Sequence, residues 1–263
     1  MGRKHRAWAV AGSIMLAMLA APSAACDTGD SAVNTPQLRV QVVATRPHDR
    51  SAFTEGLEID GGLLYESTGL EGRSTLRVDD ATTGAQLGRV DLPPEFFGEG
   101  VTRVDDTVWQ ITWKNQVAFA RDPVTLAERG RASYEGEGWG LCTLGDRVLM
   151  SNGSSTLTFR DPVTFAETGS VPLTSHGTAR LNSLNCAADG TVYANVWPTD
   201  HILHIDPDTG RVLGDIDASG LLAPADKLGT DVLNGIAQVP GTDHFLLAGK
   251  NWPLTFEVRF VPA

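Results

Sequence analysis

The segment Leu157-Thr158-Phe159-Arg160-Asp161-Pro162-Val163-Thr164 combines a short alternating strand with a turn that begins at an aspartate. The chain contains three more copies of this turn: Asp80-Ala81-Thr82-Thr83, Asp122-Pro123-Val124-Thr125 and Asp206-Pro207-Asp208-Thr209. Consecutive turns begin 42, 39 and 45 residues apart. Each turn is flanked by short apolar stretches without a long helical period, so the repeat is typical of β-propeller blades, with the turn joining a blade's two outer strands.

A second mark, a small residue followed by an aliphatic one, precedes the turns. Its five copies are Gly56-Leu57, Gly100-Val101, Gly140-Leu141, Ser183-Leu184 and Gly235-Ile236. The innermost strands of a propeller converge on the axis and leave little room for side chains. The pattern therefore predicts an all-β, five-bladed β-propeller. The last unit lacks an outer strand, and we expect Leu38–Val42 to supply it and so close the ring, which removes the exposed edges of an open sheet.

Residues 1–25 are typical of an export signal. Arg3, Lys4 and Arg6 precede an apolar run over 7–21 that is too short for a membrane span and leads into small residues. We expect cleavage before Cys26 and an exported protein, extracellular or in the cell envelope. Both lipidation of Cys26 and plain secretion stay open, because the preceding small residues lack the leucine usual in a lipoprotein box.

A polar linker over residues 26–36 is expected to precede a single domain over residues 37–263. Cys142 and Cys186 lie in that domain, and in an oxidising compartment two such cysteines are more often a disulfide than a metal or redox site. His201 and His204 stand three apart on a predicted strand and would point to opposite faces. No metal site is expected from them.

Acidic residues dominate the charge, with 32 Asp and Glu against 21 Lys and Arg and a net charge of −11. Binding to phosphate backbones needs a concentrated basic face, so a nucleic-acid partner is excluded. We expect contact with a membrane only through a lipid on Cys26. A closed, negatively charged ring gives no reason to expect more than a monomer.

Four tryptophans fall near inner-strand ends or the loops that follow them, in four different units: Trp113, Trp139, Trp197 and Trp252. Ligand sites in propellers normally lie at one end of the central channel, so these indoles are candidates for binding, although large aromatics also wedge between blades. Trp109 alternates with Ile111 inside a strand and is expected in the core.

Charged residues near the same inner-strand ends are candidates for chemistry. Glu99 stands between Gly98 and Gly100, a small-residue setting that lets its carboxylate face the channel. Glu137 is a competing carboxylate, since it also stands between two glycines. Lys250 ends an apolar run, where a lysine is costly unless it meets a partner.

The ordered local sequences resemble the plant and bacterial type of glutaminyl-peptide cyclotransferases, five-bladed propeller enzymes that convert N-terminal glutamine to pyroglutamate. The resemblance covers residues 53–258. It rests on Phe53-Thr54-Glu55-Gly56-Leu57, Tyr65-Glu66-Ser67-Thr68-Gly69-Leu70, Gly72-Arg73-Ser74, Phe97-Gly98-Glu99-Gly100, Thr112-Trp113-Lys114, Gly138-Trp139-Gly140-Leu141, Ala194-Asn195-Val196-Trp197, Val232-Leu233-Asn234-Gly235-Ile236 and Gly249-Lys250-Asn251-Trp252-Pro253.

The resemblance implies an aminoacyltransferase that needs neither metal nor cofactor and acts on peptides or proteins with N-terminal glutamine. It implies that Glu99 is the general acid/base, and Lys250 and Asn182 match a lysine and an asparagine of the family motifs. The chemistry of the reaction makes these two residues candidate catalytic donors toward the oxyanion. The residues that match the family's substrate pocket are Phe53, Trp113, Trp139 and Trp197, and Glu55 is a further candidate for binding substrate. Because the attacking α-amine must be neutral and has a pKa of about 7.7–8.0 when free, we expect activity to rise through neutral to mildly alkaline pH.

Two places depart from the family pattern. Glu55 stands where the family usually has glutamine, and an ionised carboxylate accepts hydrogen bonds but cannot donate them. It would either favour binding of a charged α-ammonium or compete with Glu99 for a proton. Ser183 and Asn185 replace two glutamates that follow Asn182 in the family motif.

Two other classes of function stay open. One is a non-catalytic propeller that binds a peptide or an envelope component. The other is a lactonase or similar hydrolase, which would gather acidic and asparagine ligands around a calcium ion on the channel axis. The asparagines that could converge there are Asn152, Asn182, Asn195 and Asn234.

Overall fold

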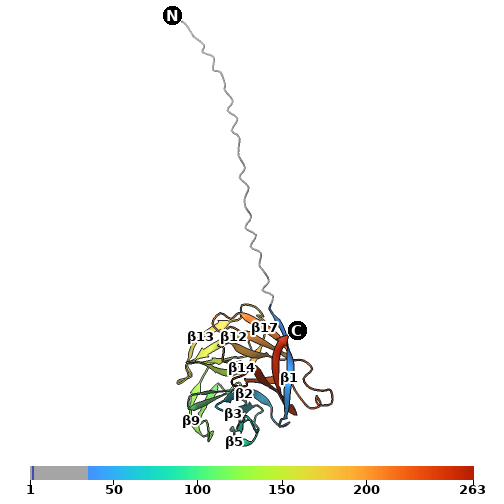
Figure 1. Cartoon of the computed structure of the whole chain (residues 1–263). Helices are drawn as coiled ribbons and strands as arrows, with labels where there is room; N and C mark the ends of the chain where they lie inside the picture. The colour runs from blue at the N-terminus through green and yellow to red at the C-terminus, as the bar shows by residue number, and fades with distance from the viewer. Residues whose placement is uncertain (1, 3–34) are drawn as a thin grey trace. The chain divides into compact units, whose positions relative to one another are not determined.

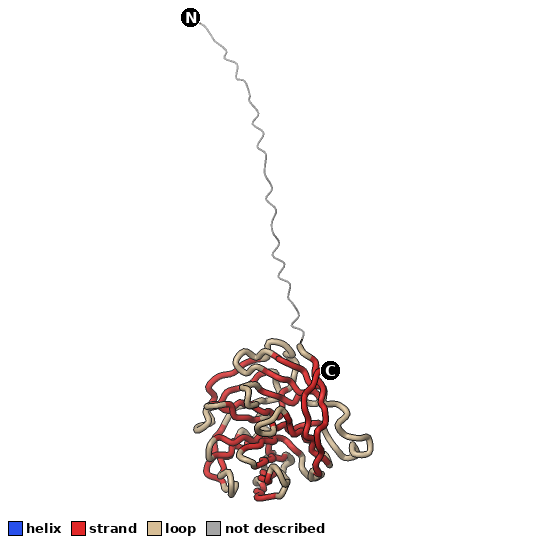
Figure 2. The backbone as a smooth tube through the Cα atoms, in the orientation of Figure 1, coloured by secondary structure: helices blue, strands red, loops and turns tan. Residues whose placement is uncertain are grey.

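The computed structural model describes residues 2 and 35–263, and residues 35–263 form one compact unit of β-strands (Figures 1 and 2). The expected signal over 1–25, apart from residue 2, and Cys26 lie outside the described residues. Among the described residues there is no helix long and apolar enough to cross a membrane.

The five predicted blades are present as four-stranded antiparallel units in chain order. The first is β2 (Thr54–Asp60), β3 (Leu63–Thr68), β4 (Thr75–Asp80) and β5 (Gln86–Asp91). The second is β6 (Gly98–Val104), β7 (Thr107–Thr112), β8 (Val117–Arg121) and β9 (Glu128–Ser133). The third is β10 (Leu141–Leu144), β11 (Arg147–Met150), β12 (Thr156–Arg160) and β13 (Glu167–Pro172). The fourth is β14 (Leu181–Cys186), β15 (Val192–Val196), β16 (His201–Ile205) and β17 (Val212–Asp217), and the fifth is β18 (Leu233–Gln238), β19 (His244–Gly249), β20 (Leu254–Pro262) and β1 (Gln37–Pro47).

The N-terminal strand closes the ring, which confirms the prediction. β1 pairs antiparallel with β20 from Leu38 opposite Pro262 to Pro47 opposite Leu254, so it runs past the predicted end at Val42. Its first residues also pair in parallel with β17, which merges the fourth and fifth blades into one eight-stranded sheet. In Figure 1 the blue β1 and the red C-terminal strand lie side by side.

The inner strands approach one another as closely as the small-residue mark predicts. A Cβ atom on Gly100 would lie 2.5 Å from the backbone nitrogen of Leu141 in the next blade. One on Gly140 would lie 2.2 Å from the backbone oxygen of Asn182 in the blade after that. Real Cβ atoms do not come this close, so only glycine fits at these two positions.

The aspartate turns join the two outer strands of the first four blades, as predicted. The Asp161 carboxylate accepts hydrogen bonds from the backbone N–H of Val163 at 3.0 Å and of Thr164 at 2.7 Å. Asp80 and Asp122 make the same pair of bonds. The side chain thus replaces a backbone acceptor in the turn, which is why aspartate recurs there.

The core lies between neighbouring blades. Trp109 packs on Phe165 there, with ring centroids 4.8 Å apart, and donates its indole N–H to the Pro162 carbonyl, which confirms its core position. The predicted disulfide between Cys142 and Cys186 is also confirmed, and it joins the inner strands of the third and fourth blades.

Candidate active site

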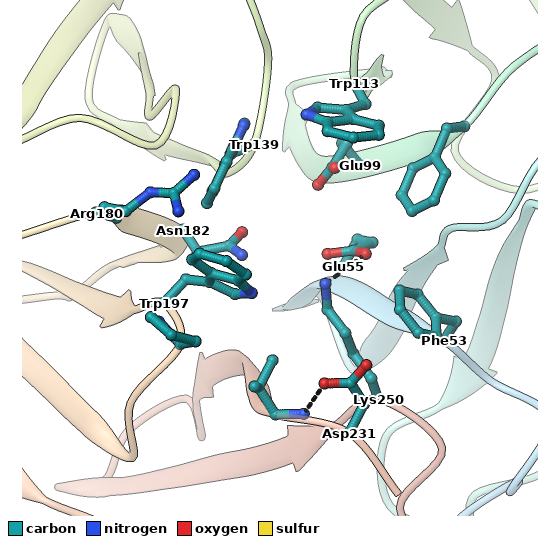
Figure 3. Close-up of a pocket in the computed structure, with 13 residues that line it drawn as sticks. Phe53, Glu55, Glu99, Trp113, Trp139, Arg180, Asn182, Trp197, Asp231 and Lys250 are labelled. Carbon is teal, nitrogen blue, oxygen red and sulfur yellow. Dashed lines mark hydrogen bonds and ion pairs between the residues drawn. The ribbon is translucent and has the colours of Figure 1, made fainter.

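A cavity of about 510 Å³ opens where the inner strands begin and the second strands end (Figure 3). All five blades contribute to its wall. The lining residues are Phe53, Glu55, Phe97, Glu99, Trp113, Trp139, Arg180, Asn182, Trp197, Pro198, Asp231, Val232 and Lys250. The cavity therefore gathers every residue to which the family resemblance gives a catalytic or substrate-binding role, but neither of the other two candidates, Trp252 and Glu137.

Two carboxyl groups and one ammonium group lie together at the base of the cavity. Glu55 is the second residue of the first inner strand, Glu99 is the second residue of the next one, and Lys250 follows the end of β19. The Lys250 Nζ atom lies 2.7 Å from Glu55 Oε1, and Asn234 donates its Nδ2–H to Glu55 Oε2 at 3.0 Å. All three charged residues are buried, with exposed fractions of 1% for Glu55, 5% for Glu99 and 7% for Lys250.

Burial and the repulsion between Glu55 and Glu99 favour the protonated form of this pair of carboxyl groups. Burial raises the pKa of Glu99 well above its ordinary value, and the nearby Glu55 charge raises it further. Burial also raises the pKa of Glu55, to about 7, although the Lys250 ammonium opposes the shift. Two buried carboxyls that share one cation cannot both ionise cheaply, so the pair retains a proton near neutral pH.

Aromatic rings form the walls above these groups. Phe53 meets Phe97 edge-on with ring centroids 6.2 Å apart, and Phe97 packs against Trp113 at 5.5 Å. On the other side, Trp139 meets Trp197 edge-on at 5.9 Å. Figure 3 shows these two aromatic walls on either side of the carboxyl groups.

Glu137, the competing carboxylate, is outside the cavity lining and holds the tryptophans instead. Its Oε2 atom accepts the indole N–H of Trp113 at 2.8 Å and that of Trp139 at 3.0 Å. Burial acts to raise the pKa of Glu137, but these two hydrogen bonds and nearby Lys114 outweigh it and lower the pKa. Glu137 is therefore an anion that fixes the planes of two cavity indoles.

Asn182 lines the cavity, and its buried side-chain oxygen has no hydrogen-bond partner in residues 35–263. Trp252 does not line the cavity, unlike the other three tryptophans singled out in the sequence. It packs in the core between the fourth and fifth blades and donates its indole N–H to the Asp231 carbonyl at 2.9 Å. The strand-end position was the same, but the ring lies against Gly249 at the end of β19 and not in the cavity lining.

Sequence reasoning missed several cavity residues. The guanidinium of Arg180 stacks 4.1 Å above the Trp197 ring and 5.0 Å from that of Trp139. Asp231 lies on the wall beside Lys250. Both precede inner strands by one or two residues, and nothing in their local sequence distinguishes them from ordinary solvent-exposed loop residues. Phe97 begins the motif Phe97-Gly98-Glu99-Gly100, and its place close to Glu99 in the sequence could have indicated that it lines the cavity.

Three of the four asparagines considered for a calcium site have other partners, and the Asn182 side-chain oxygen is the exception. Asn234 Oδ1 accepts the backbone N–H of Ser183, and Asn195 Oδ1 accepts that of Gly235. The Asn152 side-chain oxygen accepts the hydroxyl of Ser154. Within the residues described, His, Cys, Asp and Glu form no group of three or more able to hold a metal ion. These contacts argue against the lactonase hypothesis.

The fold and the cavity define a five-bladed propeller with two buried carboxyl groups and a buried ammonium group at its hub. Comparison with known proteins gives the family: the family model for glutamine cyclotransferase matches residues 13–260, and the chain belongs to this family. It is 36% identical over 231 residues to a glutaminyl-peptide cyclotransferase of Arabidopsis thaliana, covering 85% of this chain and 72% of that protein.

Solved structures agree with this assignment. The chain is similar to the glutaminyl cyclase of Myxococcus xanthus, with a TM-score of 0.76 and 33% identity over 87% of this chain and 99% of that one. The hydrazine synthase of Kuenenia stuttgartiensis matches with a TM-score of 0.50 at 14% identity over 85% of this chain and 66% of that one, which shows the fold alone.

Proposed function

We propose that this protein cyclises the N-terminal glutamine of peptides and proteins to pyroglutamate and releases ammonia. The observation that carries the proposal is Glu99, a buried carboxyl group at the base of an aromatic-walled cavity, with one oxygen that has no partner in residues 35–263. A buried polar atom normally has a partner, and the carboxyl group of Glu99 lines the cavity, so it is suited to meet a substrate there.

The reaction needs a proton carrier rather than an external nucleophile. The neutral α-amine of the substrate attacks its own γ-amide carbon, a new C–N bond forms and the bond to the amide nitrogen breaks. Glu99 delivers a proton to the departing nitrogen and takes one from the attacking nitrogen, so that ammonia leaves and the carboxyl group is restored. Such general acid/base catalysis typically contributes about 10²–10⁴-fold.

The remaining cavity residues support the same chemistry. The aromatic walls of Phe53, Trp113, Trp139 and Trp197 would hold the glutamine side chain folded back, which supplies rate by proximity. An ammonium group has three N–H donors, so Lys250 can bind Glu55 and still donate toward the oxyanion. Asn182 would provide a second donor, and each such donor commonly contributes around 3 kcal/mol.

We also propose that the protein is exported, with Cys26 as the position of a possible lipid anchor, and that it acts as a monomer without a metal ion on exported peptides and proteins. The disulfide between Cys142 and Cys186 supports an oxidising compartment, because such bonds are rare in reducing ones.

The test is ammonia release from a glutamine-leading dipeptide by the purified protein, with and without chelator. Persistent release in chelator supports a metal-independent cyclotransferase, loss in chelator indicates metal chemistry, and binding without release indicates a non-catalytic propeller. Glu99→Gln should fold normally and lose at least about a hundredfold in kcat. The matched control is Asp146→Asn, in an exposed hairpin between β10 and β11, and it should keep full activity. An active Glu99→Gln variant would overturn the role of Glu99.

A further inference from the structure

The Lys250 ammonium at the base of the cavity forms an ion pair with Glu55 rather than with Glu99. Lys250 Nζ lies 2.7 Å from Glu55 Oε1, and the other Glu55 oxygen accepts the amide N–H of Asn234 at 3.0 Å. One oxygen of Glu55 is therefore ion-paired with the Lys250 ammonium and the other accepts a hydrogen bond, and both interactions stabilise the ionised form of the carboxyl group. Figure 3 shows the Lys250 side chain reaching Glu55 rather than Glu99.

Glu99 has the opposite surroundings. No ion pair joins it to a cation in residues 35–263, and its buried Oε2 atom lacks a hydrogen-bond partner there. The charged groups that act on the pKa of Glu99 are Glu55, which raises it by repulsion and by a side-chain hydrogen bond, the Lys250 ammonium, which lowers it, and the Glu137 carboxylate, which raises it. An ionised carboxyl without a donor is costly to bury, so Glu99 is the member of the pair that keeps the proton.

Other charged groups around the cavity do not change this division. Asp231 acts on Glu55 from the wall, and Lys114 and Arg180 act on Glu137 at the tryptophans. Tyr134 lies in the core between the second and third blades, and burial raises its pKa, so it is neutral; its hydroxyl is hydrogen-bonded to the backbone of Thr112.

On the basis of the proposed function, we propose that Glu55 is a positioning residue that acts through Lys250. Because Glu55 holds the Lys250 ammonium in an ion pair, Glu99 stays protonated at neutral pH and enters the reaction as an acid. The proton of Glu99 passes to the amide nitrogen as its bond to carbon breaks and ammonia leaves. The Glu99 carboxylate then takes the proton of the newly bonded ring nitrogen, which restores the acid. Glu55 and Lys250 exchange no proton with the substrate in this sequence of steps.

This assignment predicts a bell-shaped dependence of kcat/KM on pH. The rising limb reports loss of the proton from the substrate amine, and the falling limb reports loss of the proton from Glu99. In Glu55→Gln the negative neighbour of Glu99 is gone and Lys250 is free to bind Glu99, which then ionises at lower pH. The falling limb should move down by about one pH unit or more, a tenfold change in proton concentration.

Asp231→Asn is the matched control, since it removes an acid from the same wall without breaking the Lys250 ion pair. Its falling limb should move much less. If Asp231→Asn and Glu55→Gln shift the limb equally, or if Glu55→Gln leaves it in place, the specific role of Glu55 is wrong.

A second readout does not depend on turnover. With glutamate carrying ¹³C at the side-chain carboxyl, the resonance of Glu99 is assigned by its loss in Glu99→Gln. At pH 7 it should have the shift of a carboxylic acid in the wild-type protein and of a carboxylate in Glu55→Gln. A carboxylate in the wild type refutes the inference even if Glu55→Gln does not fold. A wild type that releases no ammonia refutes the proposed function, while this spectrum still decides the charge assignment.

Discussion

His48 links the two chain segments that carry Glu55 and Lys250. Its Nδ1 atom lies 2.9 Å from the Trp252 carbonyl, and its Nε2 atom lies 2.9 Å from the Glu66 carboxylate. Glu66 also accepts the hydroxyl of Thr54, the residue before Glu55. Both partners of the ring are acceptors, so both bonds form fully only when the imidazole carries two protons. Burial disfavours the charged ring, but the hydrogen bond and charge of Glu66 outweigh it and raise the pKa of His48.

The raised pKa makes part of the stability depend on pH. A group whose pKa is higher in the folded state stabilises fully below its unfolded pKa, here near 6.5, and loses that contribution as pH rises through the folded value. We expect the free energy of unfolding to fall as pH increases from 6 to 9 and this fall to be reduced in His48→Gln. Denaturant titrations at intervals across this range measure it. Equal slopes in the two proteins would contradict the prediction.

At the residue scale, the sequence located the cavity through residue types that are unusual at strand ends. A tryptophan or a lone lysine beside an apolar strand is rare enough to stand out, as at Trp139 and Lys250. Arg180 and Asp231 were not identified as cavity residues, because charged residues are common in loops. Their place in the cavity wall depends on how neighbouring blades meet. Trp252 was wrongly selected as a candidate for binding, because its position at a strand end does not determine the direction of its side chain, which lies in the core.

At the scale of elements, β1 shows how far a strand pattern can be read. Its alternation predicted an outer strand, and β1 pairs with β20 as the outer strand of the fifth blade. The parallel pairing of β1 with β17 was not predictable from the sequence. These are the outer strands of two different blades, and they meet only because the closed ring brings them together, so neither strand's sequence indicates the pairing. The extension beyond Val42 includes a β-bulge before Ala44, which breaks the alternation on which the prediction relied.

The alternation of β1 makes a paired test of ring closure possible. Val40 is half-buried and packs on the core between the fourth and fifth blades, whereas Gln41 is exposed. Val40→Asp places a charge against that core and should lower the free energy of unfolding by about 2–3 kcal/mol, whereas Gln41→Asp should change it by no more than about 0.5 kcal/mol. Denaturant unfolding monitored by tryptophan fluorescence measures both. Similar losses in the two variants would indicate that the contact of β1 with the core is unimportant.

At the scale of the whole molecule, the disulfide constrains the ring between its third and fourth blades. Cys142 and Cys186 are 44 residues apart in sequence, and closing a loop of that length in the unfolded chain corresponds to about 4 kcal/mol in the chain-entropy account. The double variant Cys142→Ser and Cys186→Ser should therefore unfold at markedly lower denaturant concentration. Added reductant should shift the wild type in the same direction and leave the double variant unchanged. A shift of the double variant by reductant would point to a different origin.

The cavity draws its functional groups from all five blades, with Glu55 in the first, Glu99 in the second, Trp139 in the third, Asn182 in the fourth and Lys250 in the fifth. No single blade contains an acid, its cation and an aromatic wall, so the site exists only while the ring is closed. We expect ammonia release and tryptophan fluorescence to be lost over the same denaturant range, as for one cooperative unit. Activity that disappears at clearly lower denaturant would show that the hub opens locally first. Because β1 holds the ring shut, Val40→Asp should move both transitions together.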